Sequence, residues 1–177
     1  MRRVAITERD APPPGRRTPI VVCGVSGCGK STVGAALAAR LDVPFVDADD
    51  LHPPANIAKM AAGHPLTDSD RMPWLDTVGV WLEHHEGGVC ACSALRRSYR
   101  DRLRAFASDV RFVMLSVEHD VVAARVRARH GHFMPATLVD SQFADLEPLG
   151  PDEPGITVDA TMPLEAIVEE IVDRVLR

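Results

Sequence analysis

The stretch that decides the fold is residues 20–32, Ile-Val-Val-Cys-Gly-Val-Ser-Gly-Cys-Gly-Lys-Ser-Thr. Its first four residues are all apolar, which predicts a strand that is buried on both faces. Gly24, four further residues, Gly29, Lys30 and Ser31 then spell the pattern G-x-x-x-x-G-K-[ST] of a phosphate-binding loop. The Ala- and Leu-rich residues 33–41 predict a helix. Strand, glycine loop and helix therefore follow one another in the order that this motif requires.

The residue types of the loop suit a polyphosphate. Backbone N–H groups can turn inward around a phosphate only where side chains do not block them, and the helix that follows presents its positive end to the anion. Lys30 is expected to reach the β- and γ-phosphates, and Ser31 to offer its hydroxyl to Mg²⁺. The alternative, a glycine-rich turn that binds nothing, does not require the full pattern. We predict that ATP is bound by Gly24, Val25, Ser26, Gly27, Cys28, Gly29, Lys30, Ser31 and Thr32.

Length and composition indicate one soluble globular domain. The chain has 177 residues, of which 46% are hydrophobic and 25% charged. The net charge of −5 argues against a protein that binds nucleic acid broadly. No apolar stretch approaches the ~20 residues that span a bilayer, and Arg2 and Arg3 are not followed by the apolar segment of a secretory signal. We therefore expect a cytoplasmic protein with no membrane partner. The four cysteines show no metal-binding spacing.

Apolar runs and amphipathic stretches alternate along the rest of the chain. Strands are predicted over 44–47, 89–93, 111–117 and 156–159, and helices over 55–62, 73–85, 97–106, 121–129, 138–146 and 164–176. This alternation predicts an α/β fold with a parallel five-stranded sheet that helices cover on both faces, in three α/β/α layers. Residues 1–18 contain Pro12-Pro13-Pro14-Gly15 and no periodicity, so we expect a poorly ordered leader before a single domain over 19–177.

Acidic residues mark the end of the second predicted strand. Asp47 and Asp49 flank Ala48 there, at the edge of a parallel sheet where the phosphate loop also lies. One carboxylate could serve the metal ion while the other orients an attacking hydroxyl or accepts its proton. A polar turn with helix-capping acids is the plainer alternative. The chain lacks Asn-Lys-x-Asp, and Cys92-Ser93 stands where motor and ABC-type ATPases carry an Asp, so a GTPase or a motor is disfavoured.

Several further stretches carry a resemblance to a known family. They are the phosphate loop 24–31, then 47–53, 56–60, 63–68 and 70–75, and farther on 92–95, Tyr99-Arg100, Arg125, 129–133 and 141–143. Together they resemble the gluconate kinases, or gluconokinases. The resemblance extends from Ile20 to the final helix, and the block around His52, Lys59 and Trp74 is far more specific than the phosphate loop alone.

The resemblance implies ATP-dependent phosphorylation of D-gluconate at its 6-hydroxyl, which gives 6-phospho-D-gluconate and ADP. It also implies the nucleoside-monophosphate-kinase-like P-loop kinase fold, with a helical substrate-binding segment at about 50–86 and a lid at about 130–147. Members of the family are commonly dimers, so a homodimer is expected.

Roles follow for the acidic residues and the histidine. Asp49 is expected to bind the attacking hydroxyl and take its proton, and Asp47 to act on Mg²⁺ through water, beside Ser31. His52 is expected to form hydrogen bonds with substrate hydroxyls, although a histidine before two prolines could instead brace the turn.

The cations of the site are assigned with their alternatives open. Lys59 and Arg71 are candidates for the carboxylate of gluconate, where charge-assisted hydrogen bonds are strong, or they are ordinary exposed helix charges. Either Arg97 or Arg100 is expected to point into the cleft, and we favour Arg97 as a substrate ligand. His132 at the tip of the lid is expected to contact substrate or phosphate, or to shape the hinge.

Two arginines flank the predicted lid. Arg125 and Arg129 lie four residues apart and so share a helix face. We expect one to clamp the phosphates during transfer, with Lys30, and the other to stack on adenine. As surface cations they would instead pair with nearby acids.

Two rival functions remain open. Shikimate kinase is similar in its Asp-x-Asp and its lid arginines, but it places a glycine run after the third strand, whereas Gly87-Gly88 precede that strand here. A regulatory module that binds nucleotide without catalysis would retain the loop but would not need the aspartate pair.

Overall fold

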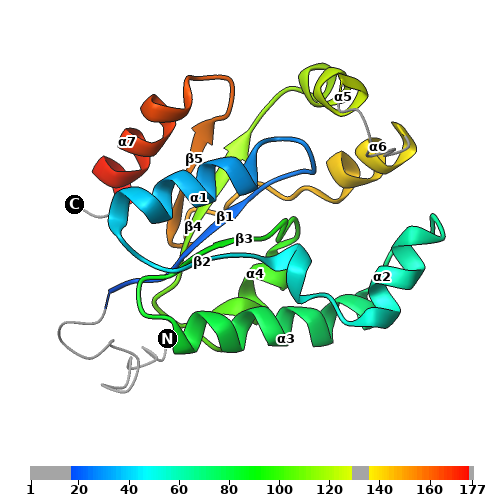
Figure 1. The fold of residues 1–177 in the computed structure, drawn as a ribbon, viewed down its shortest axis with the longest axis horizontal. Helices are drawn as coiled ribbons and strands as arrows, with labels where there is room; N and C mark the ends of the chain where they lie inside the picture. The colour runs from blue at the N-terminus through cyan, green and yellow to red at the C-terminus, as the bar shows by residue number, and fades with distance from the viewer. Residues whose placement is uncertain (1–16, 129–135, 176–177) are drawn as a thin grey trace, which may run out of the picture.

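The computed structural model describes residues 17–128 and 136–175, and its centre is a parallel five-stranded sheet (Figure 1). The strand order is β2-β3-β1-β4-β5, and every neighbouring pair is parallel. The strands are β1 Ile20–Cys23, β2 Phe45–Asp47, β3 Val89–Ala91, β4 Arg111–Ser116 and β5 Gly155–Asp159. The predicted sheet is confirmed in strand number and direction. The phosphate-loop strand is central, between β3 and β4.

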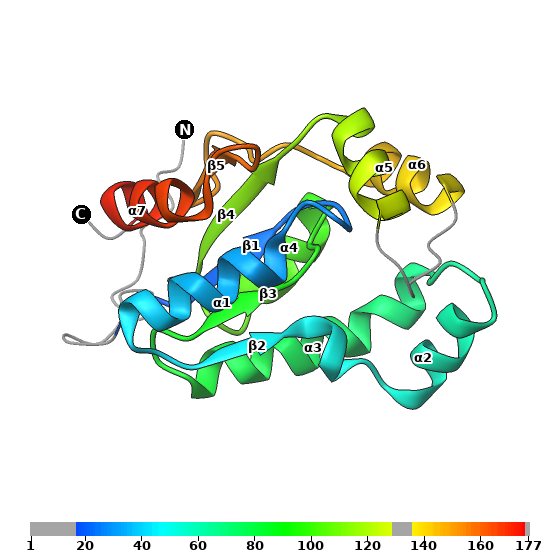
Figure 2. The ribbon, with the colours of Figure 1, turned by 45° about the horizontal axis from the view of Figure 1, so that its top comes forward.

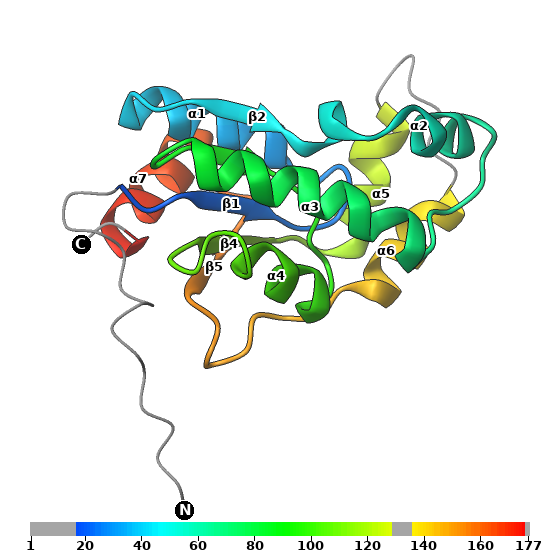
Figure 3. The same cartoon turned by 90° about the horizontal axis from the view of Figure 1, so that it is seen from below.

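Helices cover both faces of the sheet. On one face lie α1 Lys30–Leu41 and α7 Leu164–Val175, and on the other lie α3 Asp68–His84 and α4 Arg97–Arg104, which pack side by side (Figure 3). The predicted three-layer arrangement is confirmed. Within the described residues, no helix combines the length and the apolarity needed to cross a membrane.

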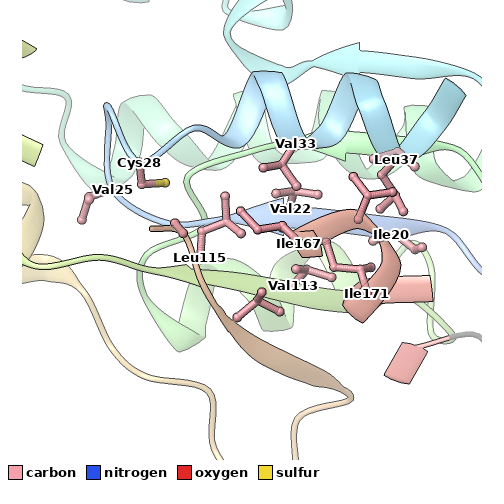
Figure 4. Close-up of a cluster of buried hydrophobic side chains, with 14 of the residues drawn as sticks. Ile20, Val22, Val25, Cys28, Val33, Leu37, Val113, Leu115, Ile167 and Ile171 are labelled. Atoms are coloured by element: carbon pink, nitrogen blue, oxygen red, sulfur yellow. The ribbon is translucent and has the colours of Figure 1, made fainter. Parts of the chain in front are cut away.

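The core is divided in two by the sheet, because successive strand residues point to opposite faces. In β1, Ile20 and Val22 pack toward α1 and α7, while Val21 and Cys23 pack toward α3 and α4. Figure 4 shows the first of these clusters, in which side chains of β1 and β4 meet those of α1 and α7. All four β1 side chains are fully buried, which explains why the sequence of this strand does not alternate between apolar and polar residues.

The remaining elements gather beyond the carboxyl ends of the strands. A 3₁₀ turn, η2 Ala48–Leu51, leads from β2 into α2 Pro54–Ala61, and the pair α5 His119–Ala128 and α6 Ala136–Asp145 follows β4 (Figure 2). The phosphate loop lies at this same end. Parallel α/β sheets bind ligands at this edge.

One predicted helix boundary is wrong by five residues. The helix expected from Pro73 begins at Asp68, and Pro73 lies inside it. Its start is set by a capping box, in which the Thr67 side chain accepts the N–H of Asp70 and the Asp70 side chain accepts that of Thr67. Proline usually occupies the first turn of a helix, which is why Pro73 suggested a later start. Most of the predicted leader (1–16) and the lid residues 130–135 lie outside the described part of the chain.

Candidate active site

The phosphate loop connects β1 to α1 as predicted, and two of its positions require glycine. Gly24 has a φ of 142°, and a Cβ there would lie 2.9 Å from Cys28 Sγ and 3.0 Å from the Leu115 carbonyl oxygen. Gly29, the N-cap of α1, has a φ of 105° and no atom within 4 Å of the position that a Cβ would take. Among the described residues, no side chain caps the N–H groups at the start of α1, which leaves them available to a phosphate.

Cys28 is a packed side chain of this loop. It is 1% exposed, and burial raises the pKa of its thiol above the ordinary value. A buried thiol of this kind is inert, so Cys28 takes part in the loop through its backbone.

Lys30, Ser31 and Asp47 surround the open side of the loop. Lys30 Nζ donates to the Val25 carbonyl oxygen over 3.0 Å, which holds the ammonium against the loop. Ser31 Oγ donates to Asp47 Oδ2, and Asp47 Oδ1 accepts the backbone N–H of Asp49 over 3.0 Å. The two residues predicted to serve Mg²⁺ are thus in contact, and their hydroxyl and carboxylate oxygens are the donor types that this ion prefers.

Asp49 stands beside this group, on the 3₁₀ turn after β2. Its carboxylate is 85% exposed, so a substrate can reach it from solvent. The pKa of Asp49 is nevertheless raised, first because surrounding protein displaces bulk water from the carboxyl and second because the Asp47 carboxylate repels its charge; Lys30 and His52 oppose the shift. A raised pKa makes a carboxylate a stronger base.

His52 is a buried neighbour of Asp49. Its side chain is 5% exposed, its Nε2 lies 4.0 Å from Asp49 Oδ1, and its ring stacks on Trp74 at 4.2 Å. Trp74 is itself fixed, because its Nε1 donates to the Ala48 carbonyl oxygen over 2.7 Å. Burial lowers the pKa of His52, and the charge of Arg71 lowers it further while Asp49 opposes this. A lowered pKa favours the neutral form of the imidazole.

The two cations assigned to the gluconate carboxylate both lie at the junction of α2 and α3. Lys59 of α2 pairs with Asp70, the residue of the capping box. Arg71 of α3 donates through Nη1 to the Tyr99 hydroxyl over 3.1 Å and lies 3.8 Å from Asp68. Neither is a fully solvated surface charge: their side chains are 34% and 24% exposed.

The structure does not place Arg97 at the cleft as predicted. Both terminal nitrogens of Arg97 donate to the carboxylate of Asp152, and Asp101 lies 3.6 Å from its Nε. Arg100, the alternative, is fully buried and pairs with Glu153. Asp152 and Glu153 both belong to the segment 147–153 between α6 and β5, so this segment binds both guanidinium groups. The expectation that one of the two arginines points into the cleft is corrected.

Arg125 lies next to the phosphate loop. Its Nη1 donates to the Cys28 carbonyl oxygen over 3.3 Å, and its Nη2 donates to that of Ala160 over 3.1 Å. Beside it is a hollow of about 420 Å³, lined by loop residues and by the segment after β5, which includes Met162 and Leu164. Sequence analysis missed this apolar wall, because small and aliphatic residues after a strand carry no chemical signature.

A second contact with the loop also escaped prediction. The backbone N–H of Ser26 donates to Gln142 Oε1 of α6 over 2.6 Å. The resemblance to the gluconokinases includes the segment 141–143, and this was the one sign in the sequence that Gln142 matters. The residue types of this segment do not indicate what Gln142 contacts. Arg129 and His132, predicted for catalysis and for substrate binding, lie outside the described residues.

Comparison with known proteins finds relatives over most of the chain. The model of a family described as "AAA domain" matches residues 20–149. The gluconokinase of Gluconobacter oxydans is 46% identical over 157 residues, which cover 86% of this chain and 88% of that protein. The thermosensitive gluconokinase of Escherichia coli is 40% identical, over 88% of this chain and 86% of that protein.

Solved structures agree with this. A gluconokinase from Sinorhizobium meliloti superposes with a TM-score of 0.84 at 47% identity, covering 92% of this chain and 94% of that one. Shikimate kinase from Aquifex aeolicus superposes with a TM-score of 0.59 at 19% identity, over 88% and 94% of the two chains. The second likeness shows a common fold alone.

Proposed function

The chain belongs to the gluconokinase family and is a kinase of gluconate, and from that premise we propose how its residues carry out the transfer. The γ-phosphoryl group of ATP passes to the 6-hydroxyl of D-gluconate, which gives 6-phospho-D-gluconate and ADP. The placement of Asp49 carries the assignment of roles. Its carboxylate is accessible to solvent, the charge of Lys30 acts on it, and His52 Nε2 lies 4.0 Å from its Oδ1. A base is thus close to the phosphate loop.

Asp49 accepts the proton of the 6-hydroxyl as its oxygen attacks the γ-phosphorus. The new O–P bond forms while the bond from phosphorus to the β–γ bridging oxygen breaks, and ADP leaves with that electron pair. Lys30 stabilises the charge on the phosphate oxygens, and Arg125 adds a second cation from α5. Arg129 is assigned to the same clamp as a prediction from sequence.

Mg²⁺ is assigned to Ser31 and to Asp47, the latter acting through water. Their contact across 16 residues of sequence supports this, because it brings a hydroxyl and a carboxylate oxygen to one point at the phosphate loop. When bound, the ion neutralises charge on the phosphates of the nucleotide.

The adenine of ATP is assigned to the hollow beside Arg125. Its wall is apolar at Ala160, Met162 and Leu164, and it adjoins Gly27, Cys28 and Gly29 of the phosphate loop. An aromatic base can lie against such a wall while its phosphates extend into the loop.

Gluconate is assigned to the segment at about 50–86, opposite the lid at about 130–147. Lys59 and Arg71 recognise its carboxylate, and His52 forms a hydrogen bond with a hydroxyl group. His132 is retained as a lid contact predicted from sequence. Arg97 is left out of this set, because its guanidinium is held by Asp152.

We propose further that the enzyme is a cytoplasmic homodimer. The resemblance to the gluconokinases supports the second statement, and light scattering on the purified protein tests it. A mass of one chain, 19.2 kDa, would contradict it.

Release of ADP in the presence of gluconate, shikimate or nucleoside monophosphates tests the function. Turnover with gluconate is expected to exceed that with the others by orders of magnitude, and phosphorus–proton correlation spectra of the product should place the phosphate on carbon 6. A preference for shikimate, or ADP release that no acceptor stimulates, would contradict the proposal. Chelation of Mg²⁺ is expected to abolish turnover.

A further inference from the structure

Behind His52 lies a buried asparagine that the catalytic scheme does not use. Asn56 of α2 is 4% exposed, and its Nδ2 lies 3.3 Å from Nδ1 of His52. The same Nδ2 lies 3.0 Å from the backbone carbonyl oxygen of Asp70, in the first turn of α3. One amide nitrogen thus joins the turn that carries His52 to the start of the next helix.

The contact with Asp70 fixes which way the amide of Asn56 faces. A backbone carbonyl oxygen only accepts hydrogen bonds, so the atom 3.0 Å from it must be the NH₂ nitrogen and not the amide oxygen. The NH₂ group has two hydrogens, one for Asp70 and one for His52. Towards the imidazole, Asn56 is therefore a donor.

A donor at this point determines the protonation of His52. Nδ1 must accept, so it carries no hydrogen, and the one hydrogen of the neutral ring is on Nε2. Protonation of both nitrogens would direct Nδ1–H against the hydrogen of Asn56. Rotation of the ring by 180° would keep its plane but put Cδ2 in the place of Nδ1, so the hydrogen bond with Asn56 would be lost.

The hydrogen on Nε2 faces the reacting group. Nε2 lies 4.0 Å from Asp49 Oδ1, which is too far for a direct hydrogen bond. A hydroxyl oxygen can, however, lie about 2.8 Å from both atoms at once, with an angle of about 90° at the oxygen. Such a hydroxyl would accept from Nε2–H and donate to Asp49, and its second lone pair would remain free to attack phosphorus.

We propose that Asn56 is a positioning residue that holds His52 in the Nε2–H tautomer, so that His52 donates to the hydroxyl of gluconate whose proton Asp49 accepts. The use of this tautomer in catalysis rests on the proposed function, but the tautomer itself does not. The charged groups nearest the imidazole are Asp49 and Arg71, and Asn56 and Trp74 complete its surroundings.

Nitrogen NMR of the histidine side chains, recorded without substrate, tests the tautomer. Long-range ¹H–¹⁵N spectra at neutral pH should show His52, identified by its loss in His52→Gln, with hydrogen on Nε2 alone. Hydrogen on Nδ1, or on both nitrogens, would overturn the proposal. The wild-type spectrum decides this point whether or not an Asn56 variant folds.

Asn56→Leu tests the role of the amide, with Ile57→Ala, at an exposed site on the same helix, as its control. We expect the His52 signals of Asn56→Leu to shift to a mixture of tautomers, and kcat to fall about tenfold while KM for ATP is unchanged.

Asn56→Asp should place hydrogen on Nδ1 of His52, because a carboxylate can only accept. If the spectrum of His52 is the same in wild type, Asn56→Leu and Asn56→Asp, Asn56 does not set the tautomer. Absence of gluconate turnover in the wild type would instead refute the function and leave the tautomer result standing.

Discussion

Gln142 of α6 occupies a backbone N–H of the phosphate loop: its Oε1 accepts from Ser26 over 2.6 Å. The N–H groups of this loop are the donors that a phosphate needs. The side chain of Gln142 therefore stands in for a phosphate oxygen, and nucleotide binding must displace it or rearrange it. The contact joins α6, which falls within the lid predicted at about 130–147, to the loop that follows β1.

Gln142→Ala is expected to tighten nucleotide binding in the absence of gluconate. Without Gln142, the nucleotide no longer competes with a side chain for the Ser26 N–H. Its binding free energy should become more favourable by the net contribution of one hydrogen bond, about 1 kcal/mol, so the dissociation constant for ADP should fall about fivefold. Titration calorimetry measures this. Ser141→Ala is the matched control, because the Ser141 hydroxyl donates to the Leu138 carbonyl oxygen within α6. Weaker binding in Gln142→Ala would show that the side chain assists the nucleotide.

Asp49→Asn should separate binding from chemistry. The amide cannot take the proton of the attacking hydroxyl, so we expect kcat to fall about 10²- to 10⁴-fold. The dissociation constant for ATP should stay within about twofold, since Lys30 and the loop are unchanged. Asp50→Asn, at the exposed neighbouring position, should retain near-wild-type turnover. Near-wild-type turnover in Asp49→Asn would remove this residue from its role.

The buried pair of Arg100 and Glu153 is expected to dominate the stability of the loops near the site. Both side chains are 0% exposed, and the guanidinium also donates to the carbonyl oxygens of Ala94 and Leu95 over 3.1 and 3.0 Å. Glu153→Leu leaves a charge without its partner in a site that excludes water. We expect the free energy of unfolding to fall by about 3–5 kcal/mol, measured by urea denaturation.

Two comparisons control this prediction. Arg97 lies on the same helix as Arg100, and its pair with Asp152 is exposed. Arg97→Met breaks that pair and should lower the free energy of unfolding by less than about 1 kcal/mol. Arg100→Met combined with Glu153→Leu should cost less than the sum of the two single changes, because no charge is left unpaired. Strict additivity would mean that the two side chains do not stabilise each other.

The sheet and the phosphate loop could be predicted because their signals are local. The apolar run of β1 and the glycine pattern that follows it each lie within a few residues, and Asp47 and Asp49 had only to be placed at the end of a parallel strand. The contact of Ser31 with Asp47 follows from that placement.

The partners of Arg97 and Arg100 could not be predicted, because they are set by tertiary packing. Asp152 and Glu153 lie 55 and 53 residues along the chain from them, in an irregular segment that no hydrophobic period places. Nothing in the sequence after β3 distinguishes a cation that faces a ligand from one that is buried against an acid. The amide of Asn56 is a similar case, because its orientation is set by the Asp70 carbonyl oxygen, which belongs to another helix.

A pH-dependent link between α5 and α6 gives the last prediction. His119 Nε2 lies 2.6 Å from Asp140 Oδ1, and its Nδ1 lies 3.5 Å from Asp120 Oδ1. Hydrogen bonds to these carboxylates, that to Asp140 first, raise the pKa of His119 above its ordinary value of 6.5. The contribution of the pair to stability is therefore fully present below pH 6.5 and is lost as the pH rises through the raised pKa.

His119→Gln should accordingly destabilise the protein more at about pH 5.5 than at about pH 8.5, relative to wild type, in thermal unfolding measured at both values. His84→Gln is the control, because Nδ1 of His84 lies 2.8 Å from a neutral acceptor, the Val80 carbonyl oxygen. An equal loss of stability at the two pH values would mean that His119 acts by packing on Phe143, 5.0 Å between ring centres, and not by its charge. In that case α6, and with it Gln142, would be held against α5 independently of pH.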